Sequence, residues 1–466
     1  MFAKLRPYGQ SASSPIAWAP ELPAHWAVRR AKSLFAKVER EPRADDGVVT
    51  CFRDGVVTLR SRRRTTGFTE SLKEIGYQGI RNGDLVIHAM DAFAGAAGVS
   101  DSDGKATPVY SVCVPRGDAN PHYYAAVVRE MARSMWIQAL SRGIRERSTD
   151  FRFDTFATQM LPVPPADEQA AIVKYLAHAN ARIDKAIAAK RRLIALLLES
   201  RAQAVDTLVL GREMSERAAS SSPWLDSIPV GWQWRRCRTL TSFVTSGSRG
   251  WAEYYSEDGP MFLQSGNLGR QLDLKLGEVQ RVALPSSMTE GLRTRVEGRD
   301  ILICITGALT GNVALVPQDW DEEAYINQHV ALVRPRHDVV NAEFLGYAMK
   351  SLPSQVQFRG SEYGGTKQGL GLDEVKNLEV LVPSLNEQQA IVEEIRVDTR
   401  RIDAAIVRAE REVALLAEFR ACLVADVVTG QVDVRAISAS LVEMDLERPA
   451  VDRPADVEDL MEMSEV

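Results

Sequence analysis

Apolar side chains recur at intervals of three and four residues along two long segments of this chain. This spacing places them on one face of a helix, and a narrow apolar stripe sustained over many turns is typical of a coiled coil. The seam residues of the two segments are Val173, Leu176, Ile183, Ile187, Ile194, Leu197 and Leu208, then Val392, Ile395, Ile402, Ile406, Val413, Leu416, Leu423 and Val427. The pattern therefore predicts two long amphipathic helices.

The expected ends of these helices carry residues that commonly start and stop a helix. A proline precedes each segment, and Asp167 and Asn386 are placed to cap the first turns. Gly211 and Gly430 follow the last seam residues and suit a C-terminal stop.

The two segments are copies of one another, 219 positions apart. Residues 161–173 resemble residues 380–392, and the register continues without a gap as far as Gly211 and Gly430. A repeat of this length indicates duplicated domains rather than a solenoid. Two matched amphipathic helices in one chain most simply pack against each other.

A weaker echo marks the start of each half of the chain. Residues 22–26 (Leu-Pro-Ala-His-Trp) resemble residues 228–232 (Ile-Pro-Val-Gly-Trp). An arginine pair follows each motif within a few residues, Arg29-Arg30 in the first half and Arg235-Arg236 in the second. Between these anchors the two halves diverge freely, so the modules share their ends and differ in their middles.

The divergent middles mix short alternating strands with turns and a few helices. Residues 109–113 and 329–333 alternate like strands, whereas residues 123–137 and 342–352 are expected to be helical. The longest uncharged stretch, residues 301–318, fits two buried strands around a turn better than a membrane span.

The predicted fold class is α/β (α+β), with two globular domains separated by two long antiparallel coiled-coil helices in a pseudo-twofold internal repeat. The expected segments are 1–26 (N-terminal segment), 27–160 (first domain), 161–222 (central helical spacer), 223–379 (second domain), 380–435 (C-terminal helical spacer) and 436–466 (acidic tail). Residues 214–223 are expected to form a linker, and the tail is expected to be disordered.

Composition and charge narrow the possible functions. The net charge is −5 and the pI about 5.9, which counts against non-specific nucleic-acid binding, so any DNA contact must come from local basic patches or from a complex. The five cysteines are scattered, with no zinc-ligand spacing, and are expected to be buried free thiols. Because no such spacing is present, we expect no metal site. No signal peptide is visible, so we expect a cytoplasmic protein.

The sharpest basic cluster lies in the first domain, at Arg60, Arg62, Arg63 and Arg64. Guanidinium groups suit phosphates and guanine edges. Residues 27–160 carry 21 Lys and Arg against 16 Asp and Glu, which favours DNA contact over a passive surface loop.

In the second domain, glycine turns, aromatic rings and amides alternate in a way that suits direct reading of bases. The candidate DNA-binding residues there are Ser248, Arg249, Tyr254, Tyr255, Gln264, Asn267, Arg270, Lys367 and Gln368. A hairpin with core aromatic residues is the alternative interpretation, and the domain has no charge excess to support DNA binding. The glycines around Lys367 are in the wrong order for a nucleotide-binding P-loop.

Catalytic motifs are not visible in the sequence. Residues 120–124 (Asn-Pro-His-Tyr-Tyr) lack the second proline of the adenine-methyltransferase motif Asn-Pro-Pro-Tyr, and no glycine-rich cofactor loop lies nearby. We find no nuclease carboxylate–lysine set and no helicase motif. We therefore expect no enzymatic activity and no catalytic residues in this chain.

The order of these features, twice over, resembles the specificity subunits of type I restriction–modification systems across nearly the whole chain. The motifs that carry the resemblance are Leu/Ile-Pro-x-x-Trp at the start of each domain, Pro-x-x-x-Glu-Gln at the start of each long helix, and residues 325–330 and 364–369 in the second domain.

The resemblance implies that each domain is a target-recognition domain that reads one half of a split double-stranded DNA site. The helices would set the distance between the halves and dock two adenine-methyltransferase subunits. The expected partner-interface residues are Glu168, Gln169, Ile172, Glu387, Gln388 and Ile391. S-adenosylmethionine would bind the methyltransferase subunits, ATP and Mg the motor-nuclease (restriction) subunits, and no cofactor this chain.

Two alternatives stay open at this point. The chain could be a coiled-coil scaffold that joins two ligand-binding α/β domains without a DNA role, or a complete enzyme whose motifs are not recognisable. Neighbouring genes for a methyltransferase and a helicase-nuclease would favour the recognition subunit, and activity of the chain alone would favour the enzyme.

Overall fold

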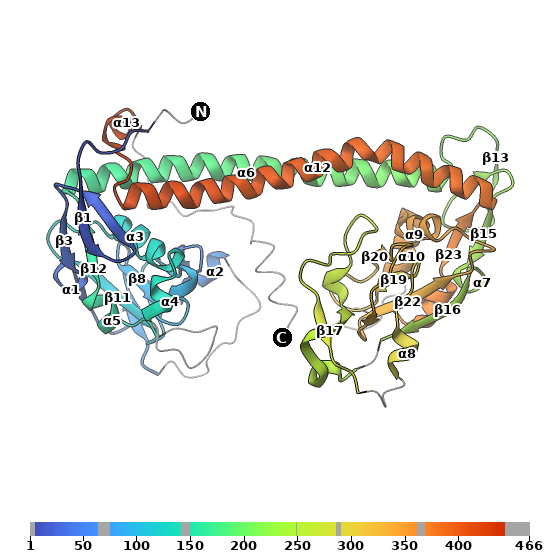
Figure 1. Ribbon diagram of the computed structural model, residues 1–466, viewed down its shortest axis with the longest axis horizontal. Coiled ribbons are helices and arrows are strands. Elements are labelled where there is room, and N and C mark those ends of the chain that lie inside the picture. The colour runs from blue at the N-terminus through green and yellow to red at the C-terminus, as the bar shows by residue number, and fades with distance from the viewer. Residues whose placement is uncertain are drawn as a thin grey trace. The chain divides into compact units, whose positions relative to one another are not determined.

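The computed structural model describes residues 5–63, 75–140, 150–247, 249–285, 290–360 and 369–442. The chain divides into two compact units: unit 1 contains Met1–Lys190 and Arg411–Val466, and unit 2 contains Arg191–Glu410. The long helices α6 (Ala166–Val209) and α12 (Leu385–Val428) each contribute one part to each unit (Figure 1). This division differs from the six predicted segments because it assigns the helix halves to the domains on which they pack.

Unit 1 is built around an antiparallel four-stranded sheet in the order β4-β11-β8-β9. Its strands are β4 (Phe35–Lys37), β8 (Leu85–His88), β9 (Ala97–Val99) and β11 (Tyr110–Pro115). The paired outer strands are β1 (Ser11–Ile16) with β2 (Ala19–Pro23), β3 (Ala27–Arg30) with β12 (Met160–Val163), β5 (Val49–Cys51) with β6 (Val57–Leu59), and β7 (Gln78–Ile80) with β10 (Gly104–Ala106). Its shorter helices are α1 (Ala31–Leu34), α2 (Arg60–Arg63), η1 (Ala92–Ala94), α3 (Pro121–Arg133), α4 (Trp136–Leu140), α5 (Phe153–Thr158) and α13 (Arg435–Ala439).

Unit 2 repeats this plan with an antiparallel sheet in the order β16-β22-β19-β20. Its strands are β16 (Thr241–Ser246), β19 (Ile301–Cys304), β20 (Val313–Leu315) and β22 (Val330–Pro335). A second sheet, β18-β17-β21, contains β17 (Tyr255–Leu263), β18 (Gln280–Val282) and β21 (Ala324–Ile326), and the two remaining pairs are β13 (Arg217–Ala219) with β14 (Ser227–Pro229) and β15 (Gln233–Arg236) with β23 (Glu379–Val382). Its helices are α7 (Cys237–Leu240), η2 (Trp251–Tyr254), η3 (Ser265–Asn267), α8 (Glu290–Thr294), α9 (Ala342–Lys350), α10 (Leu352–Gly360) and α11 (Leu372–Asn377).

The same tight turn precedes β8 in unit 1 and β19 in unit 2, although the sequences around it differ. Asp84 accepts a hydrogen bond from the backbone N–H of Arg81, and Asp300 accepts the equivalent bond from Glu297, both at 2.8 Å. Both carboxylates are buried and bonded to an arginine, Arg40 in unit 1 and Arg334 in unit 2. Duplicated domains thus keep one scaffold while their surfaces diverge, and the predicted mixed α/β fold class is confirmed.

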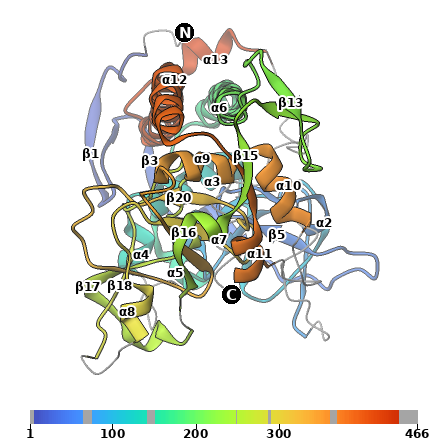
Figure 2. The same ribbon diagram turned by 90° about the vertical axis from the view of Figure 1, so that its right-hand side faces the viewer.

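Within each unit, α6 and α12 lie side by side and run antiparallel (Figure 1) (Figure 2). In unit 1, Arg420 donates to Asp184 at 2.8 Å, and in unit 2 Arg201 donates to Asp403 at 2.7 Å. The repeat offset of 219 residues relates Asp184 to Asp403 and Arg201 to Arg420, so the two ion pairs are images of one another. These ion pairs fix how the two helices are aligned with each other. The predicted apolar seam between them is confirmed.

The seam residues are most buried where the helices meet the globular parts. In unit 1, Ile183 and Ile187 of α6 share a hydrophobic cluster with Leu423 and Val427 of α12. In unit 2, Val205 and Val209 share one with Ile391, Val392 and Ile395. Each end of the helix pair is therefore part of the hydrophobic core of its own unit, and the two helices do not form a separate domain.

The helix ends agree with the sequence analysis at the C-terminus and not at the N-terminus. Gly211 and Gly430 both have positive φ, 53° and 70°, directly after the last helical turns, as predicted. Asp167 and Asn386 are not caps, because each lies inside its helix. In α12 the capping role belongs to Ser384, whose hydroxyl accepts from the N–H of Glu387 and donates to its carboxylate.

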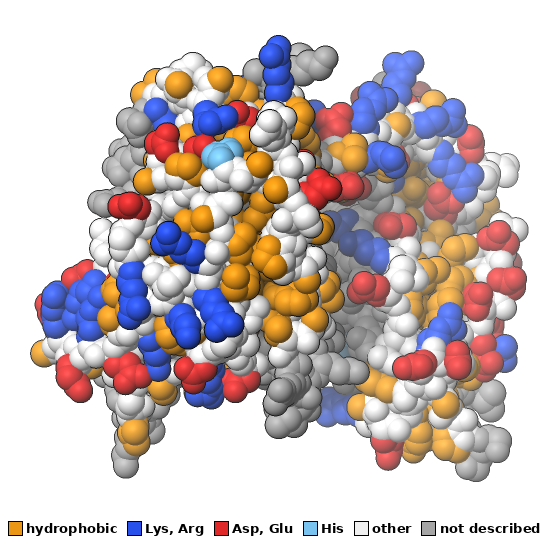
Figure 3. All heavy atoms as spheres, turned by 60° about the vertical axis from the view of Figure 1, so that its left-hand side comes forward, with side chains coloured by type: hydrophobic (Ala, Val, Ile, Leu, Met, Phe, Trp, Pro, Cys, Tyr) orange, Lys and Arg blue, Asp and Glu red, His pale blue; other side chains and the backbone are white. Residues whose placement is uncertain are grey.

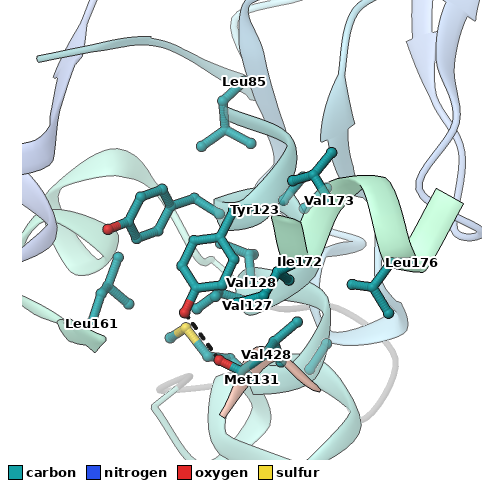
Figure 4. Packing of buried hydrophobic residues seen from close by; sticks show 14 of the residues in the cluster. Leu85, Tyr123, Val127, Val128, Met131, Leu161, Ile172, Val173, Leu176 and Val428 are labelled. Atoms are coloured by element: carbon teal, nitrogen blue, oxygen red, sulfur yellow. Dashed lines mark hydrogen bonds between the residues drawn. The ribbon is translucent and has the colours of Figure 1, made fainter. Parts of the chain in front are cut away.

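Helix α3 joins the globular part of unit 1 to both long helices. Tyr123 is fully buried, packs near Ile172 and Val173 of α6, and donates its hydroxyl to the carbonyl of Val428 on α12 at 3.0 Å (Figure 4). In unit 2 the equivalent helix α9 presents Phe344, which is also fully buried. Each of these two helices thus buries an aromatic ring three residues after its N-cap asparagine.

Other local predictions had mixed outcomes. The strands near residues 109–113 and 329–333, the helix near 342–352 and the two strands within 301–318 are confirmed, and the helix near 123–137 is split into α3 and α4. The linker prediction for residues 214–223 is wrong in part, since β13 pairs with β14 there. Four cysteines are buried free thiols as predicted, whereas Cys422 is exposed. The predicted disorder of the tail is wrong for its first residues, because α13 (Arg435–Ala439) extends into it and buries Ser438. The tail beyond residue 442 lies outside the described residues.

Candidate nucleic-acid interface

The arginine cluster of unit 1 forms the short helix α2. Arg62 donates to the hydroxyl of Ser102 at 2.8 Å and lies 3.5 Å from the carboxylate of Asp101. Arg63 forms an ion pair with Asp54 at 2.9 Å, and its guanidinium stacks 4.3 Å from the ring centre of Phe52. The side chain of Arg62 is 44% exposed and that of Arg63 only 17%, so the two arginines face different environments.

These environments separate the expected effects of two substitutions. Arg62→Ala is expected to weaken DNA binding and to lower the salt slope of binding by up to about one unit, because an exposed guanidinium contributes one phosphate contact. Arg63→Ala is expected instead to cost about 1–2 kcal/mol of stability through the lost ion pair and ring contact. Salt titration of DNA binding and thermal unfolding of each variant measure these effects. Equal losses of DNA binding for both variants would contradict this division.

Arg60 begins α2 and donates to the hydroxyl of Thr50 at 3.3 Å, so it is tied to the β5–β6 hairpin. The fourth member of the predicted cluster, Arg64, lies outside the described residues, as do Ser248, Lys367 and Gln368. Their predicted contact with DNA stays a prediction.

In unit 2 the predicted base-reading residues divide into a core part and a surface part. Trp251 is buried and stacks on Phe262, with ring centres 5.3 Å apart, so the core interpretation holds for this ring. Tyr255 is 46% exposed, and its hydroxyl accepts a hydrogen bond from Gln264 at 3.2 Å. Tyr254 is half-buried on η2.

Two arginines of the predicted set, Arg249 and Arg270, are exposed. Asn267 is different, because its buried side chain donates to the carbonyls of Lys275 and Glu278 and accepts from the N–H of Gln264. All of its polar atoms hold the turn around η3, so we leave Asn267 out of the surface that could meet a base.

The predicted partner-interface residues lie in the first turns of α6 and α12, and two of them form the same joint in both units. Gln169 accepts from the N–H of Asn120 at 2.8 Å and donates to the carbonyl of Pro164 at 2.9 Å. Gln388 makes the same bonds to Asn341 and Pro383 at the same distances. Asn120 and Asn341 cap α3 and α9, so each glutamine joins a domain helix to a long helix.

The two glutamates of these turns have unequal surroundings. Glu168 is buried and bonded to four side chains: Tyr8 at 3.0 Å, Trp26 at 2.9 Å, His25 at 2.7 Å and Arg435 at 3.2 Å. Burial and the neighbouring Glu168 raise the pKa of the Tyr8 hydroxyl. This network ties the segment before β3 and the segment after α12 to the start of α6.

Glu387 is exposed and bonded to fewer groups. It accepts from Ser384 at 2.6 Å and, more weakly, from the indole N–H of Trp232 at 3.4 Å. The hydrogen bonds from Ser384 hold the pKa of Glu387 below its usual value. Of the six predicted interface residues, the side chains of Glu168, Gln169, Ile172, Gln388 and Ile391 are buried in their own unit, and Glu387 is exposed. Their contact with a partner stays a prediction.

Sequence reasoning assigned no role to Tyr8, His25 or Arg435, although His25 lies in the motif at residues 22–26. Tyr8 and His25 precede the predicted first domain, and Arg435 lies after α12, so only the folded chain brings them together on Glu168. Across the described ranges, no group of three His, Cys, Asp or Glu side chains could hold a metal ion. No helix in the described part of the chain is long and apolar enough to cross a membrane.

Parts of this chain are similar in sequence to DNA specificity proteins. Residues 292–403 match the sequence model of the type I restriction modification DNA specificity domain. The chain is also 26% identical over 251 residues to the specificity subunit of the type I restriction enzyme EcoBI from Escherichia coli. That match spans 52% of this chain and 52% of the relative, so it covers about half the length of the curated protein.

A solved structure described for the complex assembly and conformational transition of the type I R-M system has a similar fold. The likeness covers 88% of this chain and 99% of the other, with a TM-score of 0.52 and 17% sequence identity. At this identity the comparison concerns the fold, and it agrees with the predicted arrangement of two domains and two long helices.

Proposed function

We propose that this chain, whose residues 292–403 match the DNA specificity domain of type I restriction–modification systems, is the recognition subunit of such a system, in which each unit reads one half of a bipartite DNA site. The observation that carries this proposal is a shared scaffold with unlike surfaces. Both units keep the same four-stranded sheet and the same glutamine joint. Unit 1 presents α2 with Arg62, whereas unit 2 presents Tyr255, Arg249 and Arg270. Unlike surfaces on one frame suit two different half-sites.

The two long helices suit a spacer that also docks partner proteins. Large apolar side chains are exposed along them, including Leu196 at 54% and Leu415 at 51%. These two leucines are equivalent in the repeat, 219 positions apart. Exposed apolar residues on a helix favour a protein partner, and equivalent sites favour two copies of it. We assign these sites to two adenine-methyltransferase subunits.

The chemistry of the system is assigned to the partners. S-adenosylmethionine would bind the methyltransferase subunits, and ATP and Mg the motor-nuclease subunits. Our proposal gives this chain no catalytic step. Its contribution is to bring the target adenines to the methyltransferase subunits and to exclude other sequences by differential binding.

Replacing residues 233–379 with the corresponding domain of another specificity subunit tests the proposal. We expect one half of the methylated site to change, while the other half and the spacing stay the same, because unit 1 and the helix register are untouched. A map of methylated adenines in cells that carry each variant is the measurement. A change in both half-sites, or methylation independent of the exchanged domain, would favour the alternative of a scaffold without a DNA role.

A further inference from the structure

Both units carry the same cluster of basic side chains, although their surfaces otherwise differ. The repeat echo that begins at Trp26 and Trp232 continues into Arg29, Arg30 and Lys32 in unit 1 and Arg235, Arg236 and Arg238 in unit 2. A fourth arginine follows the strand that pairs nearby, Arg116 after β11 and Arg336 after β22. We call these sets of four the matched basic patches.

The same backbone framework holds both patches. Arg116 donates its backbone N–H to the carbonyl of Leu34 at 2.7 Å, and Arg336 donates to Leu240 at 2.8 Å. The cross-strand neighbours also agree: Arg30 lies opposite Met160 in β12, and Arg236 lies opposite Glu379 in β23. Since 160 and 379 differ by the repeat offset, the two patches occupy equivalent places in the two domains.

The patch of unit 1 is the more strongly charged of the two. Its four side chains are all exposed, and within the described residues none of them forms an ion pair: Arg29, Arg30, Lys32 and Arg116. In unit 2, Arg236 lies 3.7 Å from Glu379 and Arg336 lies 3.0 Å from Asp338, so two of the four charges are partly neutralised. We therefore expect the unit 1 patch to bind an anion more strongly.

The recurrence of the patches indicates what kind of ligand they bind. Two domains that read different half-sites have no reason to share residues that contact bases. They do share any ligand that is the same at both half-sites. The DNA backbone is such a ligand, because phosphate contacts position a protein on DNA without carrying sequence information.

The surroundings of the patches favour a polyanion over a protein surface. Stable protein interfaces have an apolar core. In unit 1, no large exposed hydrophobic side chain lies in the described residues 27–37, 110–118 or 150–163. In unit 2, Phe243 is 37% exposed and pairs with Arg334, two residues before Arg336, so the lack of an apolar core is clearer in unit 1. Helix α1 and strand β3 lie at the left edge of unit 1 in Figure 1, and Figure 3 turns that side toward the viewer and shows Lys and Arg side chains on it beside hydrophobic ones.

We propose that the matched basic patches are sequence-independent binding sites for the DNA phosphate backbone, one on each recognition unit. The inference rests on the proposed function and adds to it a division of labour within each unit. The patch holds the unit on the duplex, and the unlike surfaces described above read the bases. The arginine pairs of the repeat, which sequence analysis noticed without assigning a role, then have a common purpose.

The test uses the complex of the full chain with its methyltransferase subunits. In one variant Arg29, Arg30 and Lys32 are changed together to Gln. In a control variant Lys37, Arg43 and Arg152, which are exposed in unit 1 outside the long helices and each face a carboxylate, are changed to Gln so that the net charge falls equally. Binding is measured over a range of salt concentrations on a duplex with the methylated site and on a shuffled duplex of the same composition.

We expect the patch variant to lower the slope of log affinity against log salt by about two to three units, and affinity at 0.1 M salt by at least about tenfold, equally on both duplexes. The control should change the slope by less than about one unit. The equivalent variant of Arg235, Arg236 and Arg238 should have the smaller effect of the two patches, because Glu379 already faces Arg236.

Several outcomes would overturn the inference. An unchanged slope would exclude phosphate contact, and a loss confined to the methylated duplex would show base reading instead. Loss of the methyltransferase subunits from the purified complex would make the patch a protein contact. Failure of the proposed function itself looks different, since the unaltered complex would then show no preference for the methylated duplex. Lys32→Glu alone repeats the test with a single exposed side chain.

Discussion

Inserting four residues after Leu193 is expected to lower the stability of unit 2 by about 3 kcal/mol or more. The insertion lengthens α6 by about 6 Å and carries Arg201 away from Asp403, which it now meets at 2.7 Å. It also moves Val205 and Val209 away from their apolar neighbours on α12. The loss should appear as a lower unfolding temperature, assigned to unit 2 by hydrogen exchange in its main sheet.

A second insertion provides the matched control. The ion pairs Asp184–Arg420 and Arg201–Asp403 place the position after Glu410 on α12 level with the position after Leu193 on α6. Four residues inserted at both positions leave each unit's helix register intact, so stability should return. Under the proposed function, the half-sites preferred by this double variant should lie about one or two base pairs farther apart, at roughly 3.4 Å each. A methylation map gives the spacing. Altered half-sites at unchanged spacing would refute the spacer role.

Replacing Glu168 with Ala is expected to lower the free energy of unfolding of unit 1 by about 3–5 kcal/mol. The substitution removes a buried carboxylate that accepts bonds from Trp26, Tyr8, His25 and Arg435 at once. The indole N–H of Trp26 is then left buried without its acceptor, which adds a desolvation cost.

The repeat supplies the control for this prediction. Glu387 holds the equivalent position in unit 2 but is exposed and bonded mainly to Ser384, so Glu387→Ala should cost only about 1 kcal/mol. Hydrogen exchange should accelerate in residues 5–26 and 433–442 in the Glu168 variant and stay unchanged in the Glu387 variant. If exchange in these segments is the same in both variants, other contacts hold them and the network is secondary.

Local periodicity explains how much of the fold could be predicted. The seam of α6 and α12, their glycine stops and the alternating strands depend on neighbours within a few positions, and the repeat doubled each signal. The prediction of Asp167 and Asn386 as caps was wrong because a cap depends on the residue at which the helix begins. In α12 the hydroxyl oxygen of Ser384 accepts the hydrogen bond from the first turn instead.

The candidate sites depended on contacts that the sequence does not display. Arg62 and Arg63 looked alike in a basic run, yet Asp54 and Phe52 cover Arg63 while Arg62 keeps more exposure. Asn267 looked free to meet a base, and backbone carbonyls take up its amide. Glu168 meets partners 142 to 267 positions away, and no local pattern encodes such distances.

The mirrored ion pairs have an evolutionary consequence. Helix α6 carries both an acidic and a basic member, Asp184 and Arg201, and α12 carries the same two in the same order. A single copy of this helix is therefore complementary to a second copy of itself, which is the property of an isologous interface. A protein half this size with one such helix would possess both halves of the joint and could pair with its own copy. Two copies joined in one chain keep this interface, and each domain is then free to diverge independently.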